Sequence, residues 1–289
     1  MAVHATARAG FEKAAALYAR VRPAYPAAAV QACVTAGLRG RGAVAPASPA
    51  PRAPAPAPSG LRVLDLAAGT GKFTACLLAH DGVASVTAVE PVEAMRAGLA
   101  PLRADPRLDV LAGTASAIPL PDASVDLVTI AQAFHWFADE PSLREVHRVL
   151  RPGAALALVW NIEDDRHEWV RRFRAAHEAL DEGIPQYRKG QWSEVFHGEA
   201  GSLLFPGGLA NSYFDSSVQF PDTGSLWQLV ASKSYVASLA AAEQQRVKTS
   251  VESVVAAALA DGSLRLDAQG AVHLPLRCRV VVAHRPTAA

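Results

Sequence analysis

The stretch VLDLAAGTG, residues 63–71, decides the fold of this chain of 289 residues. It continues a short apolar run and ends with Gly69 and Gly71 in a turn before a segment with helical spacing. A glycine in such a turn lets the backbone approach a ligand closely, because no Cβ stands in the way. The sequence therefore predicts a strand at residues 61–66, a tight turn and a helix at residues 72–80.

Strand and helix patterns alternate downstream of this turn. We expect further strands at residues 85–89, 108–111, 124–130 and 154–160, and helices at residues 92–102 and 140–150. Most of these strands are too apolar to face water, which is typical of a parallel sheet covered on both faces. Strands at residues 212–220 and 274–282 are predicted to pair antiparallel, with helices at residues 225–230 and 240–259 between them. The fold class is therefore predicted to be α/β.

Three other segments complete the predicted organisation. An N-terminal helical segment, residues 1–43, contains a helix that is expected to end near Arg22, because Pro23 and Pro26 follow. Residues 44–58 read VAPASPAPRAPAPAP, and so many prolines predict a stiff, solvated linker over residues 44–59. The main domain then takes residues 60–289, and aromatic residues among glycines and polar residues predict an inserted cap at about 163–211.

Composition argues against several classes of partner. Lys and Arg number 28 against 27 Asp and Glu, a formal net charge of +1, so no broad electrostatic field would attract a nucleic acid. No apolar run approaches the roughly 20 residues needed to cross a bilayer, so no membrane contact is expected. The three cysteines are far apart and no histidine pair has zinc spacing, so we expect no metal. These patterns favour reduced thiols, a cytoplasmic location and a small-molecule partner, and they leave the oligomeric state open.

Two acids lie where strands meet turns. Asp65 stands four residues before the first turn glycine, and Glu90 closes the next strand in VTAVEP. An acid at the end of a second parallel strand can bind two ribose hydroxyls with one carboxylate. A dinucleotide-binding turn carries a glycine or alanine at its last position, where this sequence has Thr74, so that pattern is not met. Lys72 lacks the glycine spacing of a phosphate loop. The pattern thus predicts a nucleoside-binding turn; the alternatives are a buried structural Asp65 and a surface Glu90.

Four stretches together resemble a known family. The runs VLDLAAGTGKFT, TAVEPVEAM, GTASAIPLPDASVDLVTIAQAFHWF and HRVLRPGAALALVWN are similar to class I S-adenosylmethionine-dependent methyltransferases of the small-molecule branch, the type 11 and trans-aconitate methyltransferase-like proteins. The resemblance covers residues 11–161 strongly and the last strands weakly. It implies a Rossmann-like, seven-stranded, mostly parallel sheet with an antiparallel last strand, and S-adenosylmethionine as cofactor.

The resemblance also implies roles for individual residues. The turn would hold the methionine end of the cofactor, Glu90 its ribose hydroxyls, and Arg22 its carboxylate. The expected cofactor-binding residues are Tyr18, Arg22, Asp65, Ala67, Gly69, Gly71, Glu90, Pro91, Met95, Thr114, Ala115, Ala131 and Gln132. The sequence departs from the family pattern at Thr114, where an acid is common, and at Ala67, where a glycine is common.

The residues after the fourth and fifth expected strands form the predicted acceptor site. His135 is expected to accept a proton or to hydrogen-bond a substrate oxygen, and the alternative is a histidine packed among aromatic rings. Trp136, Trp160 and Asn161 are the other expected substrate contacts. We therefore expect methyl transfer to a carboxylate or hydroxyl oxygen of a small molecule by in-line displacement. The alternatives are a non-catalytic cofactor-binding protein and a nucleotide-dependent oxidoreductase.

Overall fold

The computed structural model describes residues 4–41, 60–181 and 183–287. The predicted linker, residues 44–59, lies outside the described residues. Within the described residues, no helix combines the length and apolarity needed to cross a bilayer.

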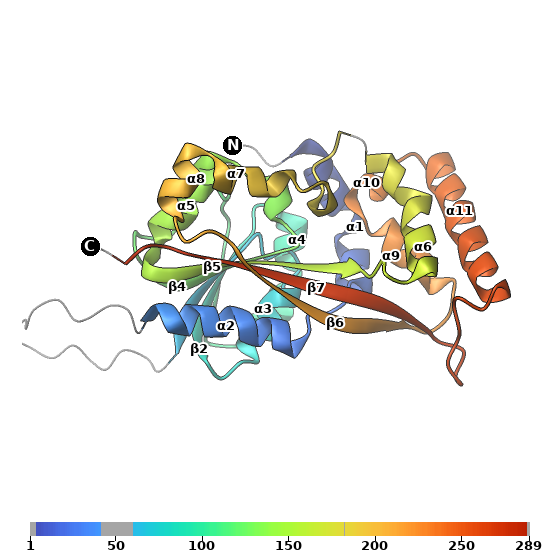
Figure 1. The fold of residues 1–289 in the computed structure, drawn as a ribbon, viewed down its shortest axis with the longest axis horizontal. Helices are drawn as coiled ribbons and strands as arrows, with labels where there is room; N and C mark the ends of the chain where they lie inside the picture. Colours follow the sequence, from blue (N-terminus) through green and yellow to red (C-terminus); the bar gives the residue numbers. More distant parts are fainter. Residues whose placement is uncertain (1–3, 42–59, 182, 288–289) are drawn as a thin grey trace, which may run out of the picture.

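One seven-stranded sheet forms the centre of the described chain (Figure 1). Its order is β3-β2-β1-β4-β5-β7-β6; β1 to β5 pair in parallel, and β7 runs antiparallel to both of its neighbours. The strands are β1 (Leu61–Leu66), β2 (Val83–Val89), β3 (Leu108–Leu111), β4 (Val125–Ala131), β5 (Leu150–Glu163), β6 (Ala210–Phe220) and β7 (Val272–His284). The predicted α/β class, the mostly parallel sheet and the antiparallel last strand are confirmed.

Helices cover both faces of this sheet (Figure 1). Side chains of α2 and α3 share one buried apolar cluster with the sheet, and α5 belongs to the cluster on the opposite face. The helices are α1 (Ala5–Val21), α2 (Ala27–Arg41), α3 (Lys72–Leu78), α4 (Glu93–Ala97), α5 (Glu140–Val149), α6 (Glu168–Glu178), α7 (Glu194–His197), α8 (Glu199–Leu204), α9 (Ser225–Ala231), α10 (Ser234–Ala237) and α11 (Ala241–Ala260).

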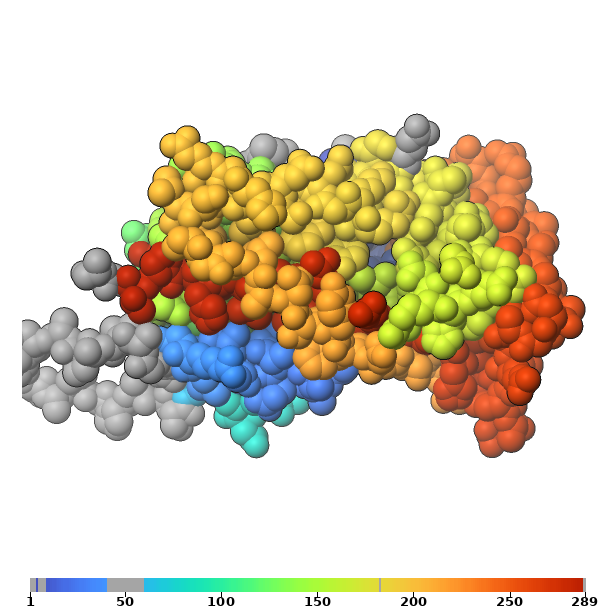
Figure 2. Space-filling model, viewed as in Figure 1, coloured from blue at the N-terminus to red at the C-terminus, as the bar shows by residue number. Residues whose placement is uncertain are grey.

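Helices of two insertions lie in two places: α6 and α9 to α11 lie beyond one end of the sheet, and α7 and α8 lie beside α5 (Figure 1). The segment between β5 and β6 supplies α6 to α8, and the segment between β6 and β7 supplies α9 to α11. Side chains of α6, α9 and α11 join the far ends of β6 and β7 in a separate apolar cluster. Figure 2 shows the yellow and orange segments covering one side of the molecule and the orange-red α11 closing one end. Within the predicted cap, residues 163–211, α6 packs against helices that follow it in the sequence, whereas Phe196 and Phe205 belong to the apolar cluster of α5.

Three local predictions need correction. The single helix predicted at residues 92–102 is interrupted after α4, and a 3-10 turn at Ala100–Ala104 follows, because Gly98 weakens a helix and Pro101 has no backbone N–H. Strand β5 is longer than the predicted residues 154–160, since its last residues pair with β7. Helix α2 was not predicted, although Val30, Cys33 and Val34 are buried against the sheet.

Candidate functional site

A cavity of about 120 Å³, the first cavity, opens at the carboxyl ends of the parallel strands. Residues directly after β1, β2 and β4 line it, together with α1 and the loop after β3. Ligands of doubly wound sheets bind at this edge, where the strand order reverses. The predicted site residues that line it are Tyr18, Ala67, Gly69, Glu90, Pro91, Met95, Thr114, Ala115, Ala131, Gln132 and Trp136.

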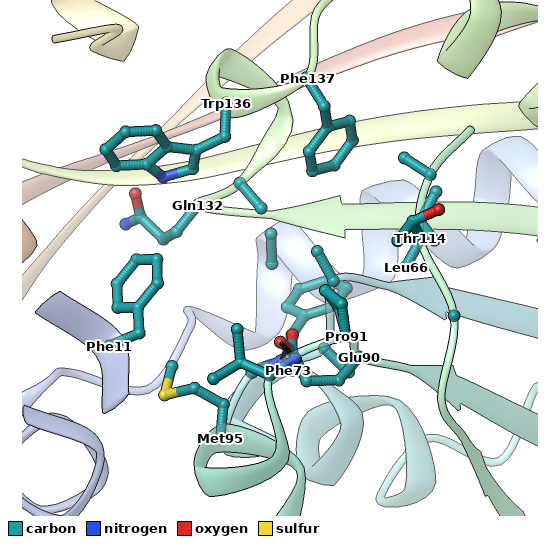
Figure 3. Close-up of a pocket in the computed structure, with 18 of the residues that line it drawn as sticks. Phe11, Leu66, Phe73, Glu90, Pro91, Met95, Thr114, Gln132, Trp136 and Phe137 are labelled. Atoms are coloured by element: carbon teal, nitrogen blue, oxygen red, sulfur yellow. Dashed lines mark hydrogen bonds between the residues drawn. The ribbon is translucent and has the colours of Figure 1, made fainter. Parts of the chain in front are cut away.

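Figure 3 shows how the side chains of the first cavity divide. Phe11, Gln132 and Trp136 lie together on one side, and Leu66 and Thr114 lie on the other. Glu90 points into the cavity from the end of β2. The cavity therefore offers one acid together with several aromatic rings.

The turn after β1 has the backbone shape that the glycine pattern predicts. Gly69 has a φ of +59° and Gly71 a φ of +85°, in the left-handed region that favours glycine. Ala67 adopts a φ of +57° although it is not glycine, a strained conformation of the kind that gathers at functional sites. A Cβ on Gly71 would stand 2.6 Å from Leu99 Cδ2. Gly71 does not line the first cavity, so its contribution is to the shape of the turn.

Glu90 is fixed by the backbone on both sides. Its Oε2 accepts the N–H of Gly69 at 2.9 Å, and its Oε1 accepts the N–H of Val92 at 2.9 Å. Burial raises the pKa of this carboxyl, while the two backbone hydrogen bonds lower it. Each carboxylate oxygen has a second lone pair, so Glu90 can still accept one hydrogen bond on each oxygen. Two neighbouring ribose hydroxyls would supply those two donors.

Asp65 lies beneath the turn and does not line the first cavity. Its Oδ2 accepts the Thr74 hydroxyl at 2.6 Å, and its Oδ1 accepts the Thr129 hydroxyl at 3.1 Å. The side chain is fully buried, and burial raises the pKa of the carboxyl to about 6. The predicted direct contact with the cofactor is therefore replaced by a structural contact that links β1, α3 and β4. Thr74, which does not fit a dinucleotide-binding turn, is thus one of the two hydrogen-bond partners of Asp65.

Two polar residues of the first cavity were missed in the sequence. Thr70 Oγ1 is buried and has no hydrogen-bond partner among the described residues, so it is free to bond a ligand. Lys72 is the only lysine or arginine among the described residues that line this cavity. Its ammonium has no counter-ion in the described chain, and burial lowers its pKa. The position of Lys72 directly after the turn is the sequence feature that could have indicated its place in the cavity.

A second, more polar cavity of about 110 Å³ adjoins the first. Phe11, Tyr18, Gln132 and Trp136 line both cavities, so the two share a wall. Of the remaining predicted residues, the second cavity takes Arg22, His135 and Asn161. Arg22 does not line the first cavity. A smaller third cavity of about 30 Å³ is lined by Arg22 together with Lys72 and Gln132.

His135 is held in one tautomer by Trp160. The indole Nε1–H of Trp160 donates to His135 Nδ1 at 3.3 Å, and an indole nitrogen can only donate. The ring proton of neutral His135 therefore lies on Nε2. Burial lowers the pKa of His135 to about 3. The ring is neutral at pH 7, and its free N–H suits a hydrogen bond to a substrate better than proton abstraction.

Trp160 itself does not reach either cavity. Its side chain is fully buried, with ring centroids 4.7 Å from both Tyr187 and Trp192. Successive side chains of a strand point to opposite faces, so Asn161 reaches the cavity where Trp160 does not. Trp160 instead contacts His135, which lines the second cavity.

The residues of the first cavity fit S-adenosylmethionine. Glu90 offers two acceptors, the unpartnered Thr70 hydroxyl offers another polar contact, and Lys72 offers a cation for a carboxylate. In the part of the chain that the structure describes, no three His, Cys, Asp or Glu side chains gather as a metal site.

Comparisons with known proteins identify similar sequences. The methyltransferase domain family matches residues 64–158. An uncharacterised methyltransferase-like protein of Schizosaccharomyces pombe is 39% identical over 142 residues, 47% of this chain and 52% of that protein. An uncharacterised methyltransferase of the same yeast is 33% identical over 200 residues, 67% of this chain and 73% of that protein. The chain thus spans about half the length of the first relative and more of the second.

A solved structure supports the fold. A putative type II methyltransferase from Anaeromyxobacter dehalogenans is 24% identical, with a TM-score of 0.55 over 91% of this chain and 96% of that one. At this identity the likeness concerns the fold alone. The longer yeast alignment, with the family match at residues 64–158, shows that this chain belongs to the type 11 methyltransferases, which use S-adenosylmethionine as methyl donor.

Proposed function

We propose that this protein transfers a methyl group from S-adenosylmethionine to a carboxylate or hydroxyl oxygen of a small molecule by in-line displacement. The observation that carries the proposal is the shared wall: a cavity that fits the cofactor adjoins a polar cavity across Phe11, Tyr18, Gln132 and Trp136. When bound, S-adenosylmethionine supplies an electrophilic sulfonium methyl group, and the new C–O bond forms as the C–S bond breaks with its electron pair left on sulfur.

Some of the described residues bind the cofactor, and others position the two reactants. Glu90, Thr70 and Lys72 bind the cofactor in the first cavity. Phe11 and Trp136, whose ring centroids are 6.1 Å apart, exclude water where the two cavities meet. Alignment of the two reactants can account for roughly 7–11 kcal/mol of the barrier, so positioning is the main demand.

His135 serves as a hydrogen-bond donor in this proposal. Its Nε2–H binds an acceptor oxygen and orients it, while its Nδ1 stays occupied by Trp160. A carboxylate acceptor has no proton to lose, so it needs no general base. A neutral histidine with a pKa of about 3 is therefore compatible with the reaction at pH 7.

Helix α1 has a direct part in this arrangement. It brings Phe11 and Tyr18 to both cavities, which supports a role for the N-terminal segment, residues 1–43, in closing over the cofactor. Helix α2, from the same segment, packs on the sheet instead. We therefore propose that α1, rather than α2, closes over the cofactor.

The test is methyl transfer from isotope-labelled S-adenosylmethionine to a panel of small carboxylic acids, phenols and amines, read by mass spectrometry. We expect labelled methyl esters or ethers from acids or phenols. Products from amines alone would contradict the choice of oxygen. Binding of S-adenosylhomocysteine without any product across the panel would favour a non-catalytic cofactor-binding protein.

A further inference from the structure

Three ion pairs line the second cavity. Each of its three carboxylates lies against one of three cations. The pairs are Lys233 Nζ with Glu163 Oε1 at 2.8 Å, Arg174 Nε with Glu178 Oε1 at 2.8 Å, and Arg188 with Asp181 Oδ2 at 2.5 Å. Two outer members of the network, Asp165 beside Arg174 and Lys189 beside Asp181, add one charge of each sign. Burial lowers the pKa of His177, so that ring adds no charge at pH 7.

Arg22 is the fourth cation of this cavity, and its charge contributes, after that of Lys233, to lowering the pKa of Glu163. Within the described residues its guanidinium forms no ion pair; its Nε donates to the Ser232 hydroxyl at 2.8 Å, and its Cζ lies 5.0 Å from the Tyr18 ring centroid. The Ser232 hydroxyl in turn donates to Leu229 O at 2.6 Å, so its lone pair faces Arg22. These contacts fix the guanidinium and leave both terminal nitrogens without a hydrogen-bond acceptor among the described residues.

An arginine fixed in this way is a carboxylate-binding group. The two terminal nitrogens of a guanidinium match the two oxygens of a carboxylate, and such bidentate bonds are among the stronger ones in proteins. The formal charge of the described groups around the cavity is +1, because four cations face three carboxylates. A bound monoanion would neutralise it, whereas a neutral ligand would leave Arg22 unpaired in a partly buried site.

We propose that the second cavity binds the methyl acceptor as an organic carboxylate, held by the guanidinium of Arg22. The inference rests on the proposed function and names the acceptor class for the same site. The family resemblance implies that Arg22 binds the carboxylate of the cofactor; in this inference Arg22 binds the carboxylate of the acceptor instead. Lys72 in the first cavity then remains for the carboxylate of the cofactor.

Asn161 supplies an independent contact for the same ligand. Its Oδ1 is buried without a hydrogen-bond partner among the described residues, while its Nδ2 donates to Ala24 O at 2.9 Å. The free oxygen is an acceptor on the wall of the second cavity. A hydroxyl on the acceptor would satisfy it, so hydroxy acids are the best probes.

The experiment uses matched acids and amides as probes. Benzoate, 4-hydroxybenzoate and crotonate are each compared with the corresponding amide, and their binding to the full chain saturated with S-adenosylhomocysteine is measured by ligand-observed NMR and calorimetry. We expect at least one acid to bind tenfold or more tightly than its amide. Arg22→Met should abolish that preference, and Arg22→Lys should keep part of it. Arg20→Met, an exposed change two residues earlier at the end of α1, is the matched control and should keep all of it.

The outcomes separate this inference from the proposed function, because the binding measurements need no turnover. Loss of acid preference in Arg22→Met with unchanged affinity for S-adenosylhomocysteine supports the inference, even if no probe is methylated. The inference is overturned if no acid is preferred to its amide. It is also overturned if Arg22→Met weakens S-adenosylhomocysteine binding and leaves acid binding unchanged, which would return Arg22 to the cofactor.

Discussion

Replacing Glu90 by alanine is expected to weaken binding of S-adenosylhomocysteine roughly ten- to a hundredfold. Hydrogen bonds to a charged group contribute about 1.5–3 kcal/mol, and each 1.4 kcal/mol is a factor of ten in affinity. Glu90 is 5% exposed and already held by two backbone N–H groups, so its carboxylate is oriented before the ligand arrives. Calorimetry gives the affinity, and thermal unfolding monitors the fold.

The ligand can be changed along with the protein. If Glu90 binds the ribose hydroxyls, Glu90→Ala should weaken adenosine binding but not that of 2′,3′-dideoxyadenosine, which has no such hydroxyls. Glu93→Ala removes an exposed acid nearby and should change neither. Equal weakening of both nucleosides by Glu90→Ala would show that the loss comes from damage to the turn.

The same assignment predicts a pH dependence. The ribose hydroxyls bind the ionised form of Glu90, whose pKa is raised by burial above its ordinary 4.5. Affinity for adenosine should therefore fall as the pH is lowered, beginning above pH 4.5, and the fall should be absent in Glu90→Ala.

Replacing Lys72 by methionine is expected to cost a similar factor for S-adenosylhomocysteine and nothing for adenosine. Lys72 is a half-buried cation without a counter-ion among the described residues, and it lines the first cavity. S-adenosylhomocysteine carries a carboxylate that this ammonium can pair with, and adenosine does not. A charge-assisted hydrogen bond of about 1.5–3 kcal/mol again corresponds to roughly ten- to a hundredfold.

The control for Lys72 is a lysine away from both cavities. Lys248→Met on α11 removes one positive charge without touching a cavity residue, so it reports any general effect of net charge. Equal weakening of S-adenosylhomocysteine and adenosine by Lys72→Met would mean that the side chain supports the turn. No weakening of either would leave the carboxylate of the cofactor without the partner assigned to it.

The sequence was sufficient for the sheet and for most of the first cavity. Strand patterns and turn glycines are local, and residues that follow parallel strands must meet at one edge of a sheet. Glu90 and Gln132 could therefore be placed in one site from their positions after β2 and β4. Helix α2 was not predicted from the sequence because its run of alanines and glycines has no distinct polar face.

Contacts between distant segments could not be predicted. Arg22 meets Ser232 across 210 positions, and His135 meets Trp160 across 25. No local spacing reveals either pair, yet the first holds the guanidinium of Arg22 in place and the second fixes the tautomer of His135. Asp65 was misplaced for a related reason, since its partner Thr129 comes from a different strand.

The central claim, that the first cavity is a site for S-adenosylmethionine, is tested most directly by calorimetric titration of the full chain with S-adenosylhomocysteine and, separately, with NAD. The turn, Glu90, Thr70 and Lys72 predict saturable binding of one S-adenosylhomocysteine per chain and no measurable binding of NAD. Tight binding of NAD, or no binding of S-adenosylhomocysteine by a folded chain, would contradict the account.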